Sequence, residues 1–321
     1  MARVEDDAVE PMRCEGLELR EQLLLGERGV DGPQREEAGR MLCVHDPHLA
    51  SASIVNGFHG HREGSMAVTE LPGVELHYTD EGPRDAPALL LVHGWGGEAR
   101  AWAPVTAVLP PRFRVIGPDL RGHGRSSAPP SGYRPAELAG DLVALMDRLG
   151  VDKAVPVGHS MGAQVATALA VQHPARVRAL AVIDPAYGAD PDEERLFADR
   201  LAALRAGGAA AAVRQLGALP SAVRAQLLAT PGHVLAKCYE GMYVTADAFG
   251  TRRTAEKFLA RRVCPALSLH SLPEPAAWES AVPAPPGTRV VTWPGTGHFL
   301  HLERPAAFAA LLTQWLMESL S

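Results

Sequence analysis

The chain has 321 residues, of which 46% are hydrophobic and 21% are charged, enough for one large core or two modest ones. The net charge of −6 falls entirely on residues 1–65, because residues 66–321 carry as many acidic as basic side chains. Without a basic surplus, nucleic acid is not expected as a partner. No apolar run approaches the roughly 20 residues of a membrane span, and the acidic start lacks a signal peptide's apolar stretch, so we expect a cytoplasmic protein with no membrane contact.

Residues 1–65 differ from the rest of the chain. They alternate glycine, charged and scattered apolar residues without a strand or helix period, apart from Leu17 to Leu25. Three interpretations fit: a disordered segment, an interaction arm, or translation from an upstream start codon. We favour a dispensable extension.

Cysteines and N-terminal histidines give no pattern typical of a metal site. The four cysteines show no C-x-x-C pair and no regular spacing, which indicates isolated thiols in a reducing compartment. They are Cys14, Cys43, Cys238 and Cys264. The histidines of residues 1–65 lack ordered spacing and acidic partners, which favours a solvated tract. They are His45, His48, His59 and His61.

The pattern of a folded domain begins near Val68. Residues 74–78 alternate between apolar and polar, and residues 88–92 form the continuous apolar run of a strand buried on both faces. That strand leads into a loop, residues 93–97. An oxyanion site needs convergent backbone donors, and the N–H of Trp95 in this loop is one candidate.

A glycine-rich turn follows the next strand, residues 113–117. Asp119, Arg121 and His123 in this turn are typical of hydrogen bonds and an ion pair that tie loops together. We therefore assign no chemistry to them.

The most informative stretch is residues 153–173. A short apolar strand leads into Gly158-His159-Ser160-Met161-Gly162, and a helix of small residues follows to about His173. This is the G-x-S-x-G nucleophile elbow in its strand–turn–helix context, with Ser160 as the candidate nucleophile. The N–H of Met161 is the second candidate oxyanion donor, because it lies at the N-terminus of that helix. The alternative is a structural turn whose serine caps the helix.

Pro156 is an anomaly in this pattern. Proline cannot donate a hydrogen bond in a central ladder, and this strand is expected to be central. A bulge beside the elbow is one solution.

A candidate base follows the strand predicted at residues 289–293. A serine hydroxyl is a weak nucleophile until a base takes its proton, and a histidine at a strand end can reach the top of the sheet. His298 is the first candidate, because Gly295 and Gly297 free its loop, and His301 is the fallback.

Together these segments resemble the α/β-hydrolase fold family over roughly residues 68–317. The resemblance rests on His93-Gly94-Trp95, Pro118-Asp119-Leu120-Arg121-Gly122-His123-Gly124, Gly158-His159-Ser160-Met161-Gly162 and Gly297-His298. It implies an eight-stranded, mostly parallel sheet with helices on both faces and a helical cap inserted after the sixth strand. The chain would then divide into an extension, a hydrolase core and a cap. These are residues 1–65, residues 66–184 with 263–321, and residues 185–262.

The resemblance leaves two candidates for the acid that orients His298. In the family the acid usually follows the seventh strand, here residues 265–270, and Glu274 falls at that place. Some relatives carry it after the sixth strand, here residues 177–183, where Asp184 follows. Either carboxylate could hold the histidine tautomer and stabilise the imidazolium. We favour Asp184, because an aspartate at the tip of an apolar strand has few structural reasons to be there.

Residues 185–262 have the periodicity of several short helices, broken by glycine and proline. The expected helices are Glu193 to Arg205, Ala209 to Gly217, Ala222 to Ala229, Val234 to Tyr243 and Thr254 to Arg262. Large side chains here and in the core suggest a mainly apolar pocket for a small-molecule substrate. The candidates to line it are Trp102, Tyr187, Tyr239, Tyr243 and Phe299.

These features favour a serine hydrolase that cleaves a carboxylic ester or lactone of moderate size. Ser160 would attack the carbonyl carbon, His298 would move the proton, and no metal or organic cofactor is needed. The same residues could serve amide cleavage, carbon–carbon bond hydrolysis or perhydrolysis. Epoxide and haloalkane hydrolysis are disfavoured, because the relatives that perform them use an aspartate where Ser160 stands. The hypothesis from another class is a small-ligand receptor on the same fold that barely turns over.

Overall fold

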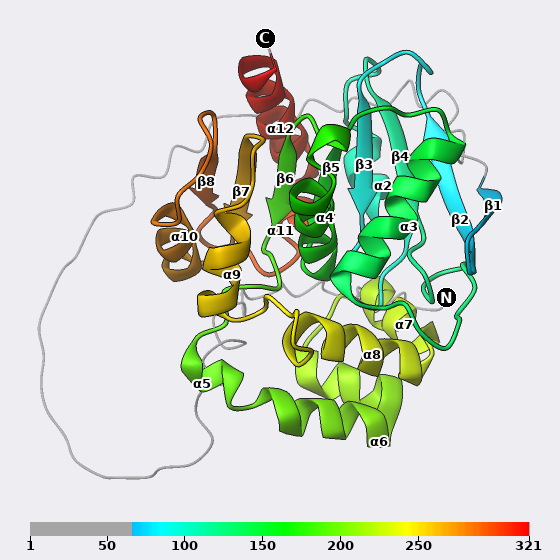
Figure 1. Ribbon diagram of the computed structural model, residues 1–321, viewed down its shortest axis with the longest axis vertical. Coiled ribbons are helices and arrows are strands. Elements are labelled where there is room, and N and C mark those ends of the chain that lie inside the picture. Colours follow the sequence, from blue (N-terminus) through cyan, green and yellow to red (C-terminus); the bar gives the residue numbers. More distant parts are fainter. Residues whose placement is uncertain (1–65, 321) are drawn as a thin grey trace, which may run out of the picture. The chain divides into compact units, whose positions relative to one another are not determined.

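An eight-stranded sheet organises the computed structural model, which describes residues 66–320 (Figure 1). The strand order is β1-β2-β4-β3-β5-β6-β7-β8, in which the β1–β2 and β2–β4 pairs are antiparallel and the other pairs are parallel. The expected mostly parallel sheet of eight strands is thereby confirmed. The strands are β1 (Ala67–Leu71), β2 (Val74–Glu81), β3 (Ala88–Val92), β4 (Arg114–Pro118), β5 (Ala154–His159), β6 (Leu180–Ile183), β7 (Ala266–His270) and β8 (Arg289–Thr292). The extension predicted at residues 1–65, with its four histidines and two cysteines, lies outside the described residues.

Helices cover both faces of this sheet. All five residues of β3 are buried, and because side chains alternate along a strand, Leu90 belongs to one hydrophobic core and Leu89 to the other. Helices α3 and α4 supply side chains to the first core, and α2 and α12 supply them to the second. These helices are α2 (Ala103–Thr106), α3 (Pro135–Arg148), α4 (Met161–Gln172) and α12 (Pro305–Ser319). Shorter elements are η1 (Ala99–Trp102), η2 (Pro174–Arg176), α10 (Pro273–Ser280) and α11 (Leu300–Glu303).

Five helices fall between β6 and β7, where the resemblance places an inserted cap. They are α5 (Pro191–Glu194), α6 (Phe197–Leu216), α7 (Ser221–Ala229), α8 (Gly232–Tyr243) and α9 (Arg252–Leu259). Figure 1 shows α5 to α8 gathered at one end of the sheet. Helices α6, α7 and α8 share a hydrophobic core of their own. None of the helices described in the structure is both long and apolar enough to cross a membrane.

Helix α6 differs from its prediction at Gly207-Gly208. The pattern predicted two helices separated by these glycines, but the structure has one helix with a kink at Gly208, where φ is 50°. A Cβ added to Gly232, the first residue of α8, would lie 2.9 Å from the Cα of Gly208. The glycines therefore allow two backbones to approach rather than ending the helix.

The segment that enters β6 has a bulge opposite Pro156. Ala154 of β5 pairs with Val177, whereas Val157 pairs with Ala181, so two residues of β5 lie opposite three on the neighbouring segment. This one-residue shift is the count of a β-bulge. It interrupts the ladder beside Pro156, which has no N–H to donate. The anticipated bulge exists, and the extra residue belongs to the segment that enters β6.

Hydrogen bonds in the turn after β4 agree with its predicted structural role. Asp119 accepts from the backbone N–H groups of Ala99 at 2.7 Å and Arg125 at 2.9 Å. The guanidinium of Arg121 donates to both carboxylate oxygens of Asp141, at 2.8 and 2.7 Å. These contacts tie the turn to η1 and α3, as expected.

The start of α4 lies against β3 and β5 because glycine occupies the two points of closest approach. A Cβ added to Gly158 would lie 2.2 Å from the carbonyl oxygen of Gly162, and a Cβ added to Gly162 would lie 2.2 Å from the carbonyl oxygen of Val92. Backbone atoms cannot rotate aside as a flexible side chain can. The position of the turn between β5 and α4 therefore depends on both glycines.

We expect Gly162→Ala to lower the free energy of unfolding by about 3 kcal/mol, because the new Cβ forces α4 away from β3. Gly140→Ala is the matched control: Gly140 lies in α3 with nothing within 4 Å of an added Cβ. Alanine there is expected to stabilise the helix by up to about 1 kcal/mol. Urea unfolding followed by circular dichroism compares the two variants. Equal stabilities would contradict the close approach.

Candidate active site

Ser160 occupies the turn between β5 and α4 in a conformation that residues other than glycine rarely adopt. Its φ is 53° and its ψ is −117°. The Ser160 N–H donates to the carbonyl of Ile183 at 2.9 Å. The Ser160 carbonyl accepts from the N–H groups of Ala163 at 3.0 Å and Ala186 at 3.2 Å. Such strain persists only where the surrounding structure requires it, and it is frequent at functional sites.

The loop after β3 lies beside Ser160 and is ordered by His93. A Cβ added to Gly94 would lie 3.4 Å from the Cβ of Ser160. His93 Nδ1 donates to the Gly94 carbonyl at 2.8 Å, and His93 Nε2 accepts from the N–H of Leu120 at 3.0 Å. Because an amide N–H only donates, the second bond defines the tautomer of His93. Burial lowers the pKa of His93 to about 4, so its ring is neutral at pH 7.

These bonds orient the peptide between Gly94 and Trp95. The Gly94 carbonyl accepts from His93 and also from the N–H of Gly97 at 3.0 Å. In a trans peptide the N–H points opposite to the carbonyl, so the Trp95 N–H is directed away from both donors. It donates to no backbone carbonyl within residues 66–320.

The N–H of Met161 is the other candidate oxyanion donor. Met161 begins α4, and the first N–H groups of a helix have no acceptor within the helix.

His298 and Asp184 form a hydrogen-bonded pair between two loops. His298 Nδ1 donates to Asp184 Oδ2 at 2.7 Å. Asp184 directly follows β6, is 8% exposed, and has a φ of 42°. The side chain of His298 is 40% exposed, so its ring can meet a substrate. This is the geometry in which a carboxylate orients an imidazole.

His159 connects the candidate nucleophile and the candidate base. Its Nε2 donates to the backbone carbonyl of His298 at 2.8 Å, and the two imidazole rings are 4.6 Å apart. Since His159 precedes Ser160 directly, this bond places the His298 loop next to the turn that carries Ser160. Burial lowers the pKa of His159 well below its ordinary value, which keeps the ring neutral.

The structure does not bring Glu274 to His298. After β7, where the resemblance usually places the acid, a helix, α10, begins at Pro273, because proline is pre-organised for the first helical position. Glu274 lies in its first turn, is 63% exposed, and accepts from Arg252 at 2.5 Å. Of the two candidate acids, Asp184 is therefore the one that contacts the histidine.

Two residues that the sequence did not single out contact this pair. Ser271, the residue after β7, donates its N–H and its hydroxyl to Asp184 Oδ1, both at 2.9 Å. His159 is the other. His159 lies at a variable position of the G-x-S-x-G pattern, and Ser271 belongs to no motif. Only their proximity to Asp184 and His298 reveals them.

A buried ionic cluster lies beyond Ser271, at the junction of β7 and α10. Glu279 is 2% exposed and accepts from His270 Nε2 at 3.0 Å and the Ser268 hydroxyl at 2.7 Å. Arg262 donates to its other oxygen at 3.3 Å. Burial opposes ionisation of Glu279, but these partners together lower its pKa below the ordinary value. The cluster joins β7 to α10 and to the segment after α9.

Aromatic rings of the inserted helices pack on the loop after β3. The ring of Tyr239 is 6.2 Å from that of Trp95 and 5.0 Å from that of Tyr243. Trp95 Nε1 also donates to the carbonyl of Leu235 in α8 at 3.1 Å. Phe299 comes from the C-terminal part of the chain, directly after His298, and its ring is 5.2 Å from that of His298.

The other predicted pocket residues lie in the interior. Trp102 is 2% exposed, and its ring is 4.7 Å from that of His301, which is also buried. Burial lowers the pKa of His301 to about 3. Tyr187 is 6% exposed and donates its hydroxyl to Glu279 at 3.3 Å, since a buried phenol requires a partner. The free thiols Cys238 and Cys264 are buried as well.

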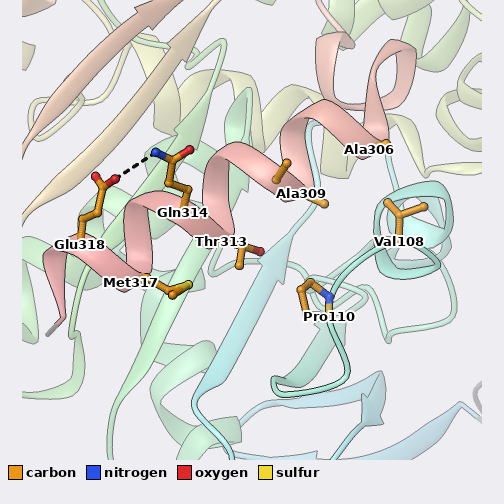
Figure 2. A pocket seen from close by; sticks show the side chains of 9 residues that line it. Val108, Pro110, Ala306, Ala309, Thr313, Gln314, Met317 and Glu318 are labelled. Atoms are coloured by element: carbon orange, nitrogen blue, oxygen red, sulfur yellow. Dashed lines mark hydrogen bonds between the residues drawn. The ribbon is translucent and has the colours of Figure 1, made fainter.

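A cavity of about 470 Å³ lies elsewhere, along α12 (Figure 2). Its lining includes Val108, Pro110 and Met317. A second cavity of about 360 Å³ lies between α6 and α8. Neither is lined by Ser160 or His298. Among residues 66–320, no group of three or more His, Cys, Asp or Glu side chains is arranged to hold a metal ion.

Comparison with known proteins establishes the family. The sequence model of the alpha/beta hydrolase fold matches residues 87–228. The dihydrolipoyllysine-residue acetyltransferase component of the acetoin cleaving system of Cupriavidus necator is 30% identical over 273 residues, which cover 77% of this chain and 68% of that protein. The chain belongs to the α/β-hydrolase fold family.

Other relatives are similar over shorter stretches or in fold. A protein from Variovorax paradoxus that is named as a carbamate hydrolase, RutD, is 40% identical over 135 residues, covering 41% of this chain and 51% of that protein. The chain thus spans about half the length of the curated relatives that match it in this way. The enol-lactonase from Burkholderia xenovorans has a TM-score of 0.66 at 27% identity, covering 78% of this chain and all of that one. An esterase from Thermogutta terrifontis has a TM-score of 0.66 at 26% identity, covering 79% and 99%.

The buried histidines predict a loss of stability in mild acid. Burial lowers the pKa of His93 to about 4 and those of His123 and His301 to about 3, and it lowers that of His159 as well. The unfolded chain binds these protons near pH 6.5, so the free energy of unfolding should fall as pH drops below 6.5, by up to about 1.4 kcal/mol per pH unit for each histidine. The fall should continue until pH approaches the folded values.

Urea unfolding at pH 8, 6 and 5 measures this fall in the wild type and in His301→Phe. Phenylalanine fits the aromatic surroundings of residue 301 and removes one titrating ring. Between pH 6 and 5, the free energy of unfolding should fall less steeply in the variant than in the wild type, by about 1 kcal/mol per pH unit. Identical slopes would contradict the assignment of His301 as a buried neutral histidine.

Proposed function

We propose that the protein is a serine hydrolase that cleaves a carboxylic ester or lactone of a mainly apolar, moderate-size substrate through an acyl-enzyme. The observation that carries this proposal is the 2.7 Å hydrogen bond between His298 and Asp184, in a loop that His159 joins to the turn of Ser160. The positive φ of Ser160 supports the same assignment. These observations support the roles of nucleophile, base and acid that we propose for Ser160, His298 and Asp184 in acyl transfer.

In the proposed reaction, the Ser160 hydroxyl attacks the carbonyl carbon. His298 Nδ1 is engaged by Asp184, which leaves Nε2 to take the hydroxyl proton and then return it to the leaving oxygen. The N–H groups of Met161 and Trp95 stabilise the oxyanion, each by about 3 kcal/mol. Water activated by His298 then attacks the acyl-enzyme and releases the acid and the free serine.

The surroundings of the site favour an apolar substrate. Tyr239, Tyr243 and Trp95 form a cluster of rings between α8 and the loop after β3. We propose that residues 185–262 act as a cap over residues 66–184 and 263–321, with the rings of Tyr239 and Tyr243 on its inner side, and that residues 1–65 are an accessory extension. The names of the enol-lactonase and esterase neighbours agree with an ester or lactone bond.

Hydrolysis of a carbamate or amide is the second candidate. It is favoured by the local 40% identity to the protein named as a carbamate hydrolase. Both reactions would use the same triad and the same acyl transfer, and they differ in the leaving group that His298 must protonate. A panel of esters, lactones and carbamates with matched acyl groups discriminates between them.

Treatment with a fluorophosphonate probe should add one adduct to the wild-type protein and none to Ser160→Ala. The reagent reacts with serine hydroxyls whose proton is taken by a neighbouring base. Intact-mass analysis counts the adducts, and the unfolded wild type is the control for nonspecific labelling. Absence of labelling on folded wild type would contradict the proposal and favour a ligand receptor on the same fold.

Asp184→Asn should reduce kcat by about 10⁴-fold, because the amide no longer supports the histidine tautomer that accepts the serine proton. Glu274→Gln is the matched control and should leave kcat within about twofold, since Glu274 forms an exposed ion pair of little energetic weight. His298→Ala should abolish turnover. The initial rate with a reactive ester measures all three. Inactivation by Glu274→Gln alone would show that the acid has been wrongly assigned.

A further inference from the structure

We propose that Ser271 is a positioning residue for the acid of the triad. Its N–H and hydroxyl both donate to Asp184 Oδ1, so that Asp184 Oδ2 faces His298. This inference rests on the proposed function, and it assigns a role to a residue that touches neither the nucleophile nor the base.

The two carboxylate oxygens of Asp184 accept hydrogen bonds from different segments, one from the residue after β7 and the other from the loop after β8. Oδ1 accepts two hydrogen bonds from Ser271, each 2.9 Å long, and Oδ2 accepts from His298 Nδ1 at 2.7 Å. Asp184 and Ser271 are each 8% exposed, so water competes weakly for either oxygen. The Asp184 N–H also donates to the carbonyl of Leu269 at 2.7 Å, which continues the β6–β7 ladder by one residue. The acid is therefore bound to β7 through backbone and side chain together.

Asp184 requires such support, because it lies just beyond the regular strand. Its φ of 42° is outside the conformations that strands adopt, and the orientation of its carboxylate about χ2 depends on the hydrogen bonds that the two oxygens accept. Two donors to one oxygen fix the plane of the carboxylate. They also stabilise its charged form, which is the form that stabilises the imidazolium.

Ser271 is itself held in place by the buried cluster at Glu279. His270, the neighbour of Ser271, is bonded to Glu279 at 3.0 Å, and its carbonyl accepts from the N–H of Trp293 at 2.9 Å. Arg262 completes the charge balance of Glu279. The end of β7 is thus bonded to α10 through Glu279 and to the residue after β8 through Trp293, and these bonds fix the position from which Ser271 donates to Asp184.

The test compares variants that differ in one donor. Ser271→Ala removes the hydroxyl and keeps the N–H, and it should slow fluorophosphonate labelling and lower kcat by about tenfold with KM unchanged. Ser271→Thr keeps the hydroxyl and should stay within about threefold of wild type. Ser280→Ala is the matched control, because the Ser280 hydroxyl donates to the carbonyl of Ala276 within α10 and should have no effect. If Ser271→Ala does not fold, Ser271→Cys, a weaker donor of similar size, takes its place.

A double-mutant cycle separates positioning from general support of the fold. In an Asp184→Asn background, Ser271→Ala should cause no further loss of labelling rate, because the residue acts through Asp184. Losses that multiply in the double variant would overturn the proposal. An unchanged labelling rate in Ser271→Ala alone would also overturn it.

A proton NMR measurement keeps the test independent of catalysis. The His298 Nδ1 proton in a charge-assisted hydrogen bond should give a downfield signal, assigned by its absence in His298→Ala. Ser271→Ala should broaden or remove this signal and Ser271→Thr should keep it. If the wild type is not labelled, the proposed hydrolase function fails. The NMR signal still tests the positioning role in that case. Persistence of the signal in Ser271→Ala would overturn this role, and loss of the signal would support it.

Discussion

The approach of α4 to the ends of β3 and β5 is the constraint on which the candidate site depends. Gly158 and Gly162 allow the backbones of these elements to come into direct contact, and any side chain there would collide with a carbonyl oxygen. The contact places the N-terminus of α4 close to the end of β3, and the loop after β3 lies beside Ser160. This proximity is what the proposed pair of backbone donors, from Met161 and Trp95, requires.

The parallel order of β5, β6 and β7 brings the remaining groups together. The carboxyl ends of parallel neighbours lie at one edge of a sheet, so the residues that follow these three strands are neighbours in space. Those residues are Ser160, Asp184 and Ser271. The residue after β5 is the proposed nucleophile, the residue after β6, Asp184, is the proposed acid, and the residue after β7 donates two hydrogen bonds to that acid.

The sequence predicts those parts of the molecule that follow from local patterns. The β3 and β5 runs, the elbow and the His298 loop each have a signature of apolar residues and glycines, and the sheet follows from the family resemblance. Glu274 was a candidate because it follows the seventh strand, where the resemblance usually places the acid, and no local pattern indicated that α10 begins at Pro273. Ser271 and His159 could not be identified, because their contacts join residues 87 and 139 positions apart. The interior positions of Trp102 and Tyr187 likewise depend on partners, His301 and Glu279, that no local pattern reveals.

The histidines near Ser160 differ in how far their rings are buried, and this difference separates their roles. His93 and His159 are enclosed, and burial lowers the pKa of each, so both rings are neutral and act as fixed donors to the carbonyls of Gly94 and His298. His298 differs in having its side chain 40% exposed and a carboxylate on one ring nitrogen. A ring that is open to solvent can contact a substrate, whereas an enclosed ring cannot, and protonating the enclosed ring would bury a charge. The enclosed histidines therefore define the geometry in which the exposed one is proposed to act.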